Sequence, residues 1–165
     1  MKRSAVVLGL SVLALTGLVM AQGHAGHSHG HGTPEPVRAL STQVHASQCW
    51  VRMLPEPAPS AAYLELENKG EQSVALVGAS TLSFGHVMLH QTTEHDGMSR
   101  MSHASEVEIP AGGKLSLKPG AFHVMLGQAK EDLALGERII LSLHLSDDTQ
   151  VQAECELRPA KTQAY

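Results

Sequence analysis

Apolar and polar residues alternate with a period of two along most of the chain after residue 36, as in β-strands with one buried face. Short stretches rich in Gly, Pro, Asn and Asp separate these segments and predict turns. The expected strands are residues 37–44, 48–53, 61–67, 73–79, 85–90, 106–109, 114–118, 122–126, 138–145 and 150–157. Segment 128–135 has room for one helical turn at most. Many short strands without a long helical period predict an antiparallel β-sandwich or barrel.

The first residues have a different pattern. Residues 1–3 include two basic side chains, Lys2 and Arg3, and residues 4–20 are uncharged and mostly apolar. Val19 and Ala21 are small residues at the positions that a signal peptidase reads. We therefore expect residues 1–21 to be a signal peptide and the protein to reside in the periplasm or another extracytoplasmic space. The alternative is a membrane anchor, but the uncharged run is short for a span and no basic residues follow it.

Residues 22–36 are rich in Gly, Pro and His and nearly free of apolar side chains, so we expect a flexible tail. Its histidines are spaced so that a mobile chain can wrap imidazoles around Cu(II), Zn(II) or Ni(II). These residues are His24, His27, His29 and His31. The alternative is a plain solvated linker. What remains is long enough for one core, so we expect a single domain at 37–160 and a short C-terminal tail at 161–165.

The candidate chemistry lies in two expected strands and the segment between them. Period two places His86, Met88 and His90 on the outward face of one strand, and His123 and Met125 about 6.5–7 Å apart on one face of another. Residues 91–105 are expected to form a long loop that folds over the strand ends and adds a donor. The loop carries His95, Met98, Met101 and His103.

Imidazoles and thioethers brought together form a soft donor set that suits Cu(I). Taken singly, each methionine could be core filler and each histidine a surface group. A blue-copper centre would need a cysteine ligand, and neither Cys49 nor Cys155 is near the His123 segment. No nucleophile and base, paired carboxylates or phosphate loop stands out, so we expect no enzyme. The formal net charge of −4, more acidic once the signal peptide is removed, disfavours nucleic-acid binding.

The two cysteines are an even number in a chain expected to be exported. This favours a structural disulfide between Cys49 and Cys155. Two buried free thiols are the alternative. A redox pair is disfavoured because the residues do not form Cys-x-x-Cys.

The spacing His90-x10-Met101-x21-His123-x-Met125 resembles the motif of the periplasmic PCuAC copper chaperones. The likeness covers roughly residues 42–157, and includes Trp-Val-Arg at 50–52, Ala-Ala-Tyr-Leu at 61–64 and Ile-Pro-Ala-Gly-Gly at 109–113. It implies an all-β, cupredoxin-like antiparallel Greek-key β-sandwich of a single domain.

The resemblance also implies that one Cu(I) is held near the surface by His90, Met101, His123 and Met125. Members often carry a second methionine just after the first histidine, whereas this chain has Met88 before it. The set is therefore three or four donors, with Met88 and Met98 as possible additions.

Two functions are open at this point. The first is a metallochaperone that passes Cu(I) to a recipient, such as a cytochrome c oxidase subunit during copper-centre assembly or a thiol-bearing copper chaperone. Contact with a membrane would then occur only through a membrane-bound partner. The second is a copper or zinc buffering or resistance protein in which the His-rich tail is the main binder.

Overall fold

The computed structural model describes residues 37–130 and 132–164, and all regular elements in these ranges are β-strands. The expected signal peptide and the His-rich tail lie outside the described residues. Within the described part of the chain, no helix has the length and hydropathy needed to span a membrane.

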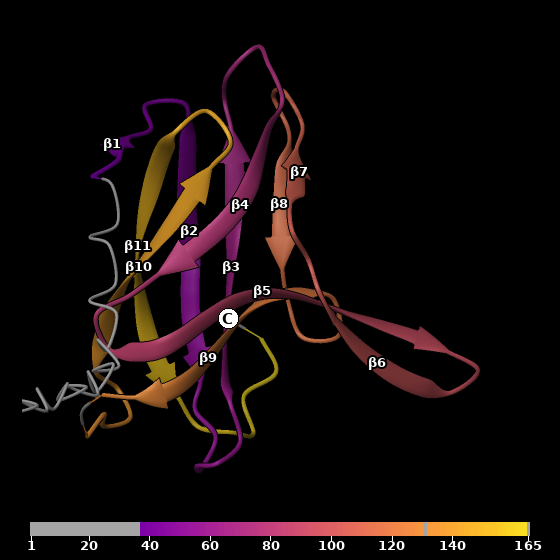
Figure 1. Cartoon of the computed structure of the whole chain (residues 1–165), viewed down its shortest axis with the longest axis vertical. Coiled ribbons are helices and arrows are strands. Elements are labelled where there is room, and N and C mark those ends of the chain that lie inside the picture. Colours follow the sequence, from indigo (N-terminus) through magenta and orange to yellow (C-terminus); the bar gives the residue numbers. More distant parts are fainter. Residues whose placement is uncertain (1–36, 131, 165) are drawn as a thin grey trace, which may run out of the picture. The chain divides into compact units, whose positions relative to one another are not determined.

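Eleven strands follow one another along the chain (Figure 1). They are β1 (Ala39–Leu40), β2 (Val44–Arg52), β3 (Ser60–Asn68), β4 (Val74–Ser80), β5 (Phe84–His95), β6 (Met98–His103), β7 (Val107–Ile109), β8 (Lys114–Leu117), β9 (Phe122–Ala129), β10 (Arg138–Leu145) and β11 (Thr149–Arg158). Hydrogen bonds join them in the order β6-β5-β9-β3-β2-β11-β10-β4-β7, with β1 on β11 and β8 on β3.

The core shows that this sheet folds over on itself. Leu76 from β4 and Leu89 from β5 belong to the same buried cluster, although their strands are far apart in the sheet order. The cluster also takes alternate residues from β10, where Ile139, Leu141 and Leu143 are buried. The expected all-β sandwich is confirmed. Most pairings are antiparallel as expected, but β11 runs parallel to both β1 and β2.

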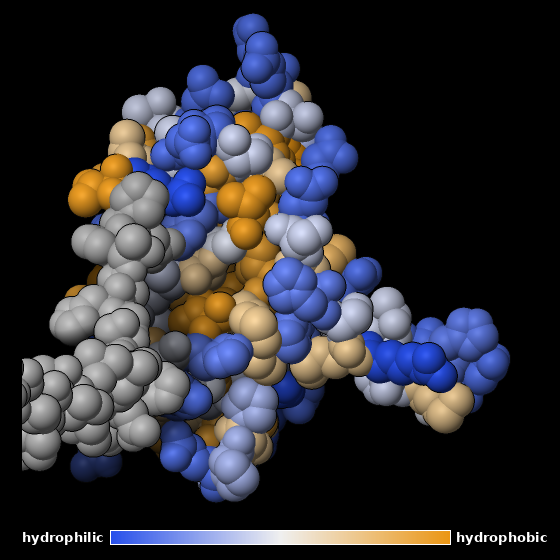
Figure 2. All heavy atoms as spheres, viewed as in Figure 1, coloured by the Kyte–Doolittle hydropathy of each residue, from blue (hydrophilic) through white to orange (hydrophobic). Residues whose placement is uncertain are grey.

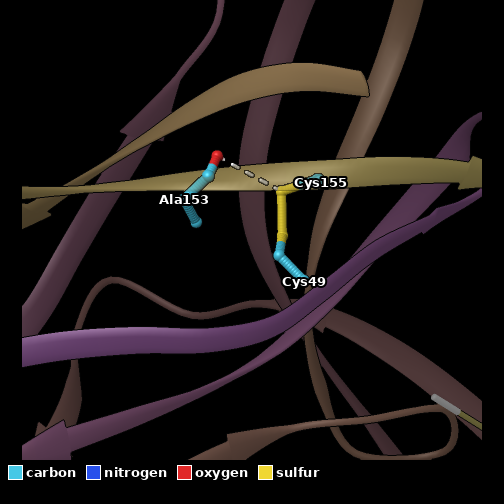
Figure 3. The surroundings of a disulfide bond; sticks show 3 residues. All are labelled: Cys49, Ala153 and Cys155. Carbon is cyan, nitrogen blue, oxygen red and sulfur yellow. Dashed lines mark hydrogen bonds between the residues drawn. A yellow bond between two sulfur atoms is a disulfide. The ribbon is translucent and has the colours of Figure 1, made fainter. Parts of the chain in front are cut away.

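The disulfide links two of these parallel strands. Cys49 on β2 and Cys155 on β11 are bonded, with Cα atoms 4.4 Å apart (Figure 3). Both side chains are buried in the main core. The predicted disulfide is therefore confirmed, and the alternative of two buried free thiols is wrong.

One expected strand near the start of the domain is interrupted, and the segment before β10 is not helical in its described residues. The strand expected at 37–44 is interrupted because the Ser41 hydroxyl accepts hydrogen bonds from the backbone N–H groups of Gln43 and Val44, which turns the chain. The helical turn considered for 128–135 does not form in its described residues, since β9 continues to Ala129.

The segment 91–105 is not a loop but the larger part of a β-hairpin. β5 continues to His95, and β6 pairs with it in continuous register up to the pair His95–Met98. Asp96 and Gly97 make the two-residue turn with φ of +52° and +73°, both in the left-handed region that such hairpins require. The hairpin extends away from the other strands (Figure 1), and its surface is largely hydrophilic (Figure 2).

Candidate metal centre

Strand register brings the predicted ligands to one place. His90 on β5 lies directly opposite His123 on β9 and opposite His103 on β6. In the neighbouring rows, Met88 lies opposite Met125, and Met101 lies opposite Thr92. Paired residues share a face of a sheet, and so do residues two apart on one strand. One face of β6, β5 and β9 therefore carries all four predicted ligands together with Met88 and His103.

The spacing of the imidazoles suits a shared ion. The ring centroids of His90 and His123 are 5.9 Å apart, with the rings at 80°. A metal–nitrogen bond of about 2.0–2.1 Å and about 1.1 Å more to the ring centre allow centroids of two rings on one ion to be at most ~6.4 Å apart. The two rings are thus within the range of a common ion.

His123 is fixed in the form that binds a metal. Its side chain is only 4% exposed, and its Nδ1 lies 3.1 Å from the backbone oxygen of Ala121. A carbonyl oxygen only accepts hydrogen bonds, so Nδ1 carries the hydrogen and Nε2 keeps a free lone pair. Burial lowers the pKa of His123, the hydrogen bond to Ala121 opposes this, and the charge of Arg52 lowers it further.

His90 has a polar side-chain atom without a hydrogen-bond partner. Its Nδ1 is buried and has no hydrogen-bond partner in the described part of the chain. Burial lowers the pKa of His90, and repulsion from His123, His103 and His86 lowers it further. A buried polar atom without a partner is costly. A metal ion would satisfy it, so this donor set fits a bound metal.

The inner wall of the centre is aromatic. The rings of Tyr63 and His123 are 6.2 Å apart, and those of Trp50 and Tyr63 are 4.6 Å apart. The guanidinium carbon of Arg52 lies 5.4 Å from the Tyr63 ring centre. Burial raises the pKa of Tyr63, although the charge of Arg52 opposes this. The packing of Tyr63 beside His123 was not foreseen from the sequence, because it depends on the pairing of β3 with β9.

The outer part of the centre is exposed. Met101 is 57% exposed on β6. Met98 is also exposed, but it pairs with His95 and lies on the opposite face of the hairpin, away from His90. With the side chains as they stand, no three His, Cys, Asp or Glu residues in the described part of the chain surround one point. Methionine is not among these residue types. Of the predicted additional donors, Met88 shares the face and Met98 does not.

The chain belongs to the LpqE-like family, described as "Putative lipoprotein LpqE-like", which it matches over residues 44–157. It is 34% identical over 105 residues to "Putative lipoprotein Lxx21020" of Leifsonia xyli subsp. xyli, with 63% of each chain covered. It is 30% identical over 112 residues to "Uncharacterized protein RP573" of Rickettsia prowazekii, covering 65% of this chain and 62% of that protein. Both matches thus span less than two thirds of the relative.

Solved structures with the same fold include PCuAC domains. The apo PmoF2 PCuAC domain matches with a TM-score of 0.61 at 16% identity, covering 78% of this chain and 98% of that domain. The solution structure of CuI-DR1885 from Deinococcus radiodurans matches with a TM-score of 0.55 at 30% identity, covering 78% and 83%. The cupredoxin-like β-sandwich expected from the resemblance is confirmed, while the four-residue ligand set stays a prediction.

Proposed function

We propose that this protein is an extracytoplasmic copper chaperone that binds one Cu(I) ion and passes it to a partner protein. Its ligands are His90, Met101, His123 and Met125. The observation that carries the proposal is the pairing of His90 with His123: Nδ1 of His90 has no hydrogen-bond partner in the described residues, and Nδ1 of His123 is engaged by the Ala121 oxygen, so that its Nε2 is the nitrogen with a lone pair to offer. The structural relative from D. radiodurans, at 30% identity, was solved in a Cu(I) form.

The donor types favour delivery over electron transfer or catalysis. Neutral thioethers select Cu(I) but are weak donors, so a recipient that offers thiolates can remove the ion by ligand exchange. Both cysteines are joined in the buried disulfide, which leaves neither as the thiolate that a blue-copper centre uses. We propose no enzymatic activity.

The recipient in this proposal is a cytochrome c oxidase subunit or a thiol-bearing copper chaperone, and the transfer serves assembly of the oxidase copper centre. The proposed location outside the cytoplasm is supported by the disulfide, by the signal-peptide pattern of residues 1–21, and by the name lipoprotein given to the Leifsonia relative. Any contact with a membrane would be through a membrane-bound recipient.

The four histidines of residues 22–36 favour a second function, copper or zinc buffering by the tail. Deletion of residues 22–36 distinguishes the chaperone function from the buffering function. If the domain is the chaperone, the shortened protein should still bind one Cu(I) with the affinity of the parent and should still transfer it to a thiol-bearing acceptor. The measurement is a competition titration with a Cu(I)-specific chelator, followed by transfer to the acceptor. Loss of tight Cu(I) binding on deletion would favour the buffer.

The tail and the domain should also respond differently to pH. Free imidazoles have a pKa of about 6.5, so only about a tenth of them remains neutral at pH 5.5. A peptide of residues 22–36 should therefore bind Cu(II) at least about tenfold more weakly at pH 5.5 than at pH 7.5. The lowered pKa values of His90 and His123 keep both neutral further into acid, so Cu(I) binding by the tail-deleted domain should fall less.

Calorimetry of the peptide with Cu(II) at the two pH values tests the tail, and the chelator competition at the same values tests the domain. Equal peptide affinities at pH 5.5 and 7.5 would contradict binding by histidine.

A further inference from the structure

Strand β6 ends the strand order of the sheet, so one of its two edges pairs with no other strand in the described part of the chain. The other edge is hydrogen-bonded to β5 along the whole hairpin. All six residues of β6 are exposed, and the hairpin extends away from the other strands (Figure 1). β7, at the opposite end of the strand order, is only three residues long. β6 therefore has the longer free edge of the two.

The register of the hairpin identifies the backbone groups on this free edge. In an antiparallel pair, directly opposite residues either exchange both backbone hydrogen bonds or exchange none, in alternation. His95 and Met98 flank the two-residue turn, and residues in this position exchange both. Alternation along the register then gives Ser99, Met101 and His103 as the residues of β6 that exchange none with β5. Their N–H and C=O groups therefore point outward, to the free edge.

An independent hydrogen bond gives the same assignment. The N–H of Ala104 donates to the oxygen of Leu89 at 2.9 Å. These two residues flank the opposed pair of His90 and His103. A bond of this kind surrounds a pair that exchanges no hydrogen bonds itself. The backbone of His103 is thus directed away from β5.

The free edge of β6 lacks the features that protect most exposed edges. Edge strands are commonly blocked by Pro, by Lys or by a bulge. β6 contains neither Pro nor Lys, and its pairing with β5 is continuous, without a bulge. An extended segment of another protein can therefore add to β6 through backbone hydrogen bonds, which is a common way for a sheet edge to recognise a partner.

A strand added here would place its side chains beside the proposed ligands. It would lie about 4.7–4.9 Å from β6, with successive side chains on opposite faces. Side chains opposite Ser99 and Met101 would share the ligand face, because paired residues share a face of a sheet. A side chain opposite Arg100 would lie on the other face. Arg100 is exposed, and the ion pairs among the described residues do not include it, so an acidic side chain there would have complementary charge.

We propose that the free edge of β6 is the docking site for the copper recipient, which adds an extended segment to the sheet as a further strand. The segment carries thiols at two alternate positions and an acidic residue between them, as in Cys-Glu-Cys. The thiols then lie on the face of Met101, and the carboxylate lies beside Arg100. This inference rests on the proposed function and names the surface and the chemistry of the partner that receives the ion.

The test uses the full chain without copper and the probe peptide Thr-Val-Cys-Glu-Cys-Val-Thr, kept free of oxygen. Nuclear magnetic resonance measures amide hydrogen exchange and the affinity of the peptide. Bound peptide should slow exchange at the outward amides of Ser99, Met101 and His103. The amides of Arg100 and Ser102 already bond to β5 and should change much less.

Two methylated peptides provide the matched comparison. Methyl groups on the backbone nitrogens of alternate residues block either the edge of the peptide that faces β6 or the edge that faces solvent. Methylation of the edge that faces β6 should weaken binding at least about tenfold, because hydrogen bonds are lost. Methylation of the other edge should leave the affinity unchanged. This alternation is the signature of an added strand, and docking through side chains alone would not produce it.

Two variants of Ser99 test the protein side of the interface. Ser99→Pro removes one outward N–H and places a ring on the edge, but it leaves the hydrogen bonds to β5 intact. It should weaken binding of the unmethylated peptide about tenfold. Ser99→Ala keeps the N–H and is the matched control that should bind as the parent does. Neither variant changes a proposed copper ligand.

Equal effects of the two methylated peptides would overturn the proposal, and so would parent-like peptide binding by a folded Ser99→Pro protein. Protection of the same three amides in a dimer of the protein without peptide would also overturn it, because the edge would then be occupied by a second copy. Failure of the proposed function has a different signature. The peptide would still protect the three amides, but the chain would bind no Cu(I) in competition with a Cu(I)-specific chelator.

Discussion

Replacement of His123 by alanine should lower Cu(I) affinity by more than about 100-fold. Changes to residues that merely orient a metal ligand cost about 10–100-fold, and loss of the ligand itself should exceed this range. Among the proposed ligands, His123 is the one whose position the surrounding structure fixes most firmly. It is buried on β9, its Nδ1 is held by Ala121, and Tyr63 packs beside it.

The measurement is a competition titration with a Cu(I)-specific chelator on the tail-deleted protein. Met101→Leu and Met125→Leu conserve volume, so they should keep the fold while weakening Cu(I) binding less than His123→Ala does. His45→Ala removes an exposed imidazole from β2 and is the control that should bind as the parent does. A melting curve checks that each variant is folded. Parent-like affinity in a folded His123→Ala protein would refute the proposed centre.

Removal of the disulfide should produce the largest loss of stability. Cys49 and Cys155 are 106 residues apart in the sequence, so their bond closes nearly the whole domain into one loop. The chain-entropy estimate for a loop of this size is about 4–5 kcal/mol, and removal of native disulfides costs ~2–5 kcal/mol in practice. For a domain of this size the melting temperature should fall by roughly 10 °C or more.

The melting temperature of the double variant Cys49→Ala, Cys155→Ala is compared with that of the parent. Alkylation without reductant, followed by mass spectrometry, checks that the parent has no labelled thiol. Copper stoichiometry should stay at one Cu(I) per tail-deleted domain, because the disulfide lies in the core and not on the ligand face. A melting temperature equal to that of the parent would show that the bond contributes nothing to stability. Loss of Cu(I) from a folded double variant would instead identify the cysteines as ligands.

Period-two alternation predicted strands well where one face is buried. In β10, the alternating burial of Ile139, Leu141 and Leu143 follows directly from the sequence. The same rule missed the hairpin of β5 and β6, since all six residues of β6 are exposed and no buried face imposes alternation there. The available signal was Asp96-Gly97, which is typical of two-residue hairpin turns.

The site was predictable within single strands but not between them. Period two correctly placed Met88 with His90, and His123 with Met125, because each pair shares one strand. The cross-strand pairing of His90 with His123 depends on the register between β5 and β9, which no local sequence pattern specifies. The place of His103 depends on the hairpin that the alternation rule missed.

The contrast between buried His123 and exposed Met101 has a consequence for the kinetics of release. In the proposed transfer, a recipient that approaches the hairpin would meet the thioether first, and one of its thiolates would take that coordination position while the inner imidazoles still hold the ion. The ion would then be held by both proteins at once during the exchange, and it would not be released into solution. The release rate should accordingly rise with recipient concentration, and it should be independent of how often the domain unfolds.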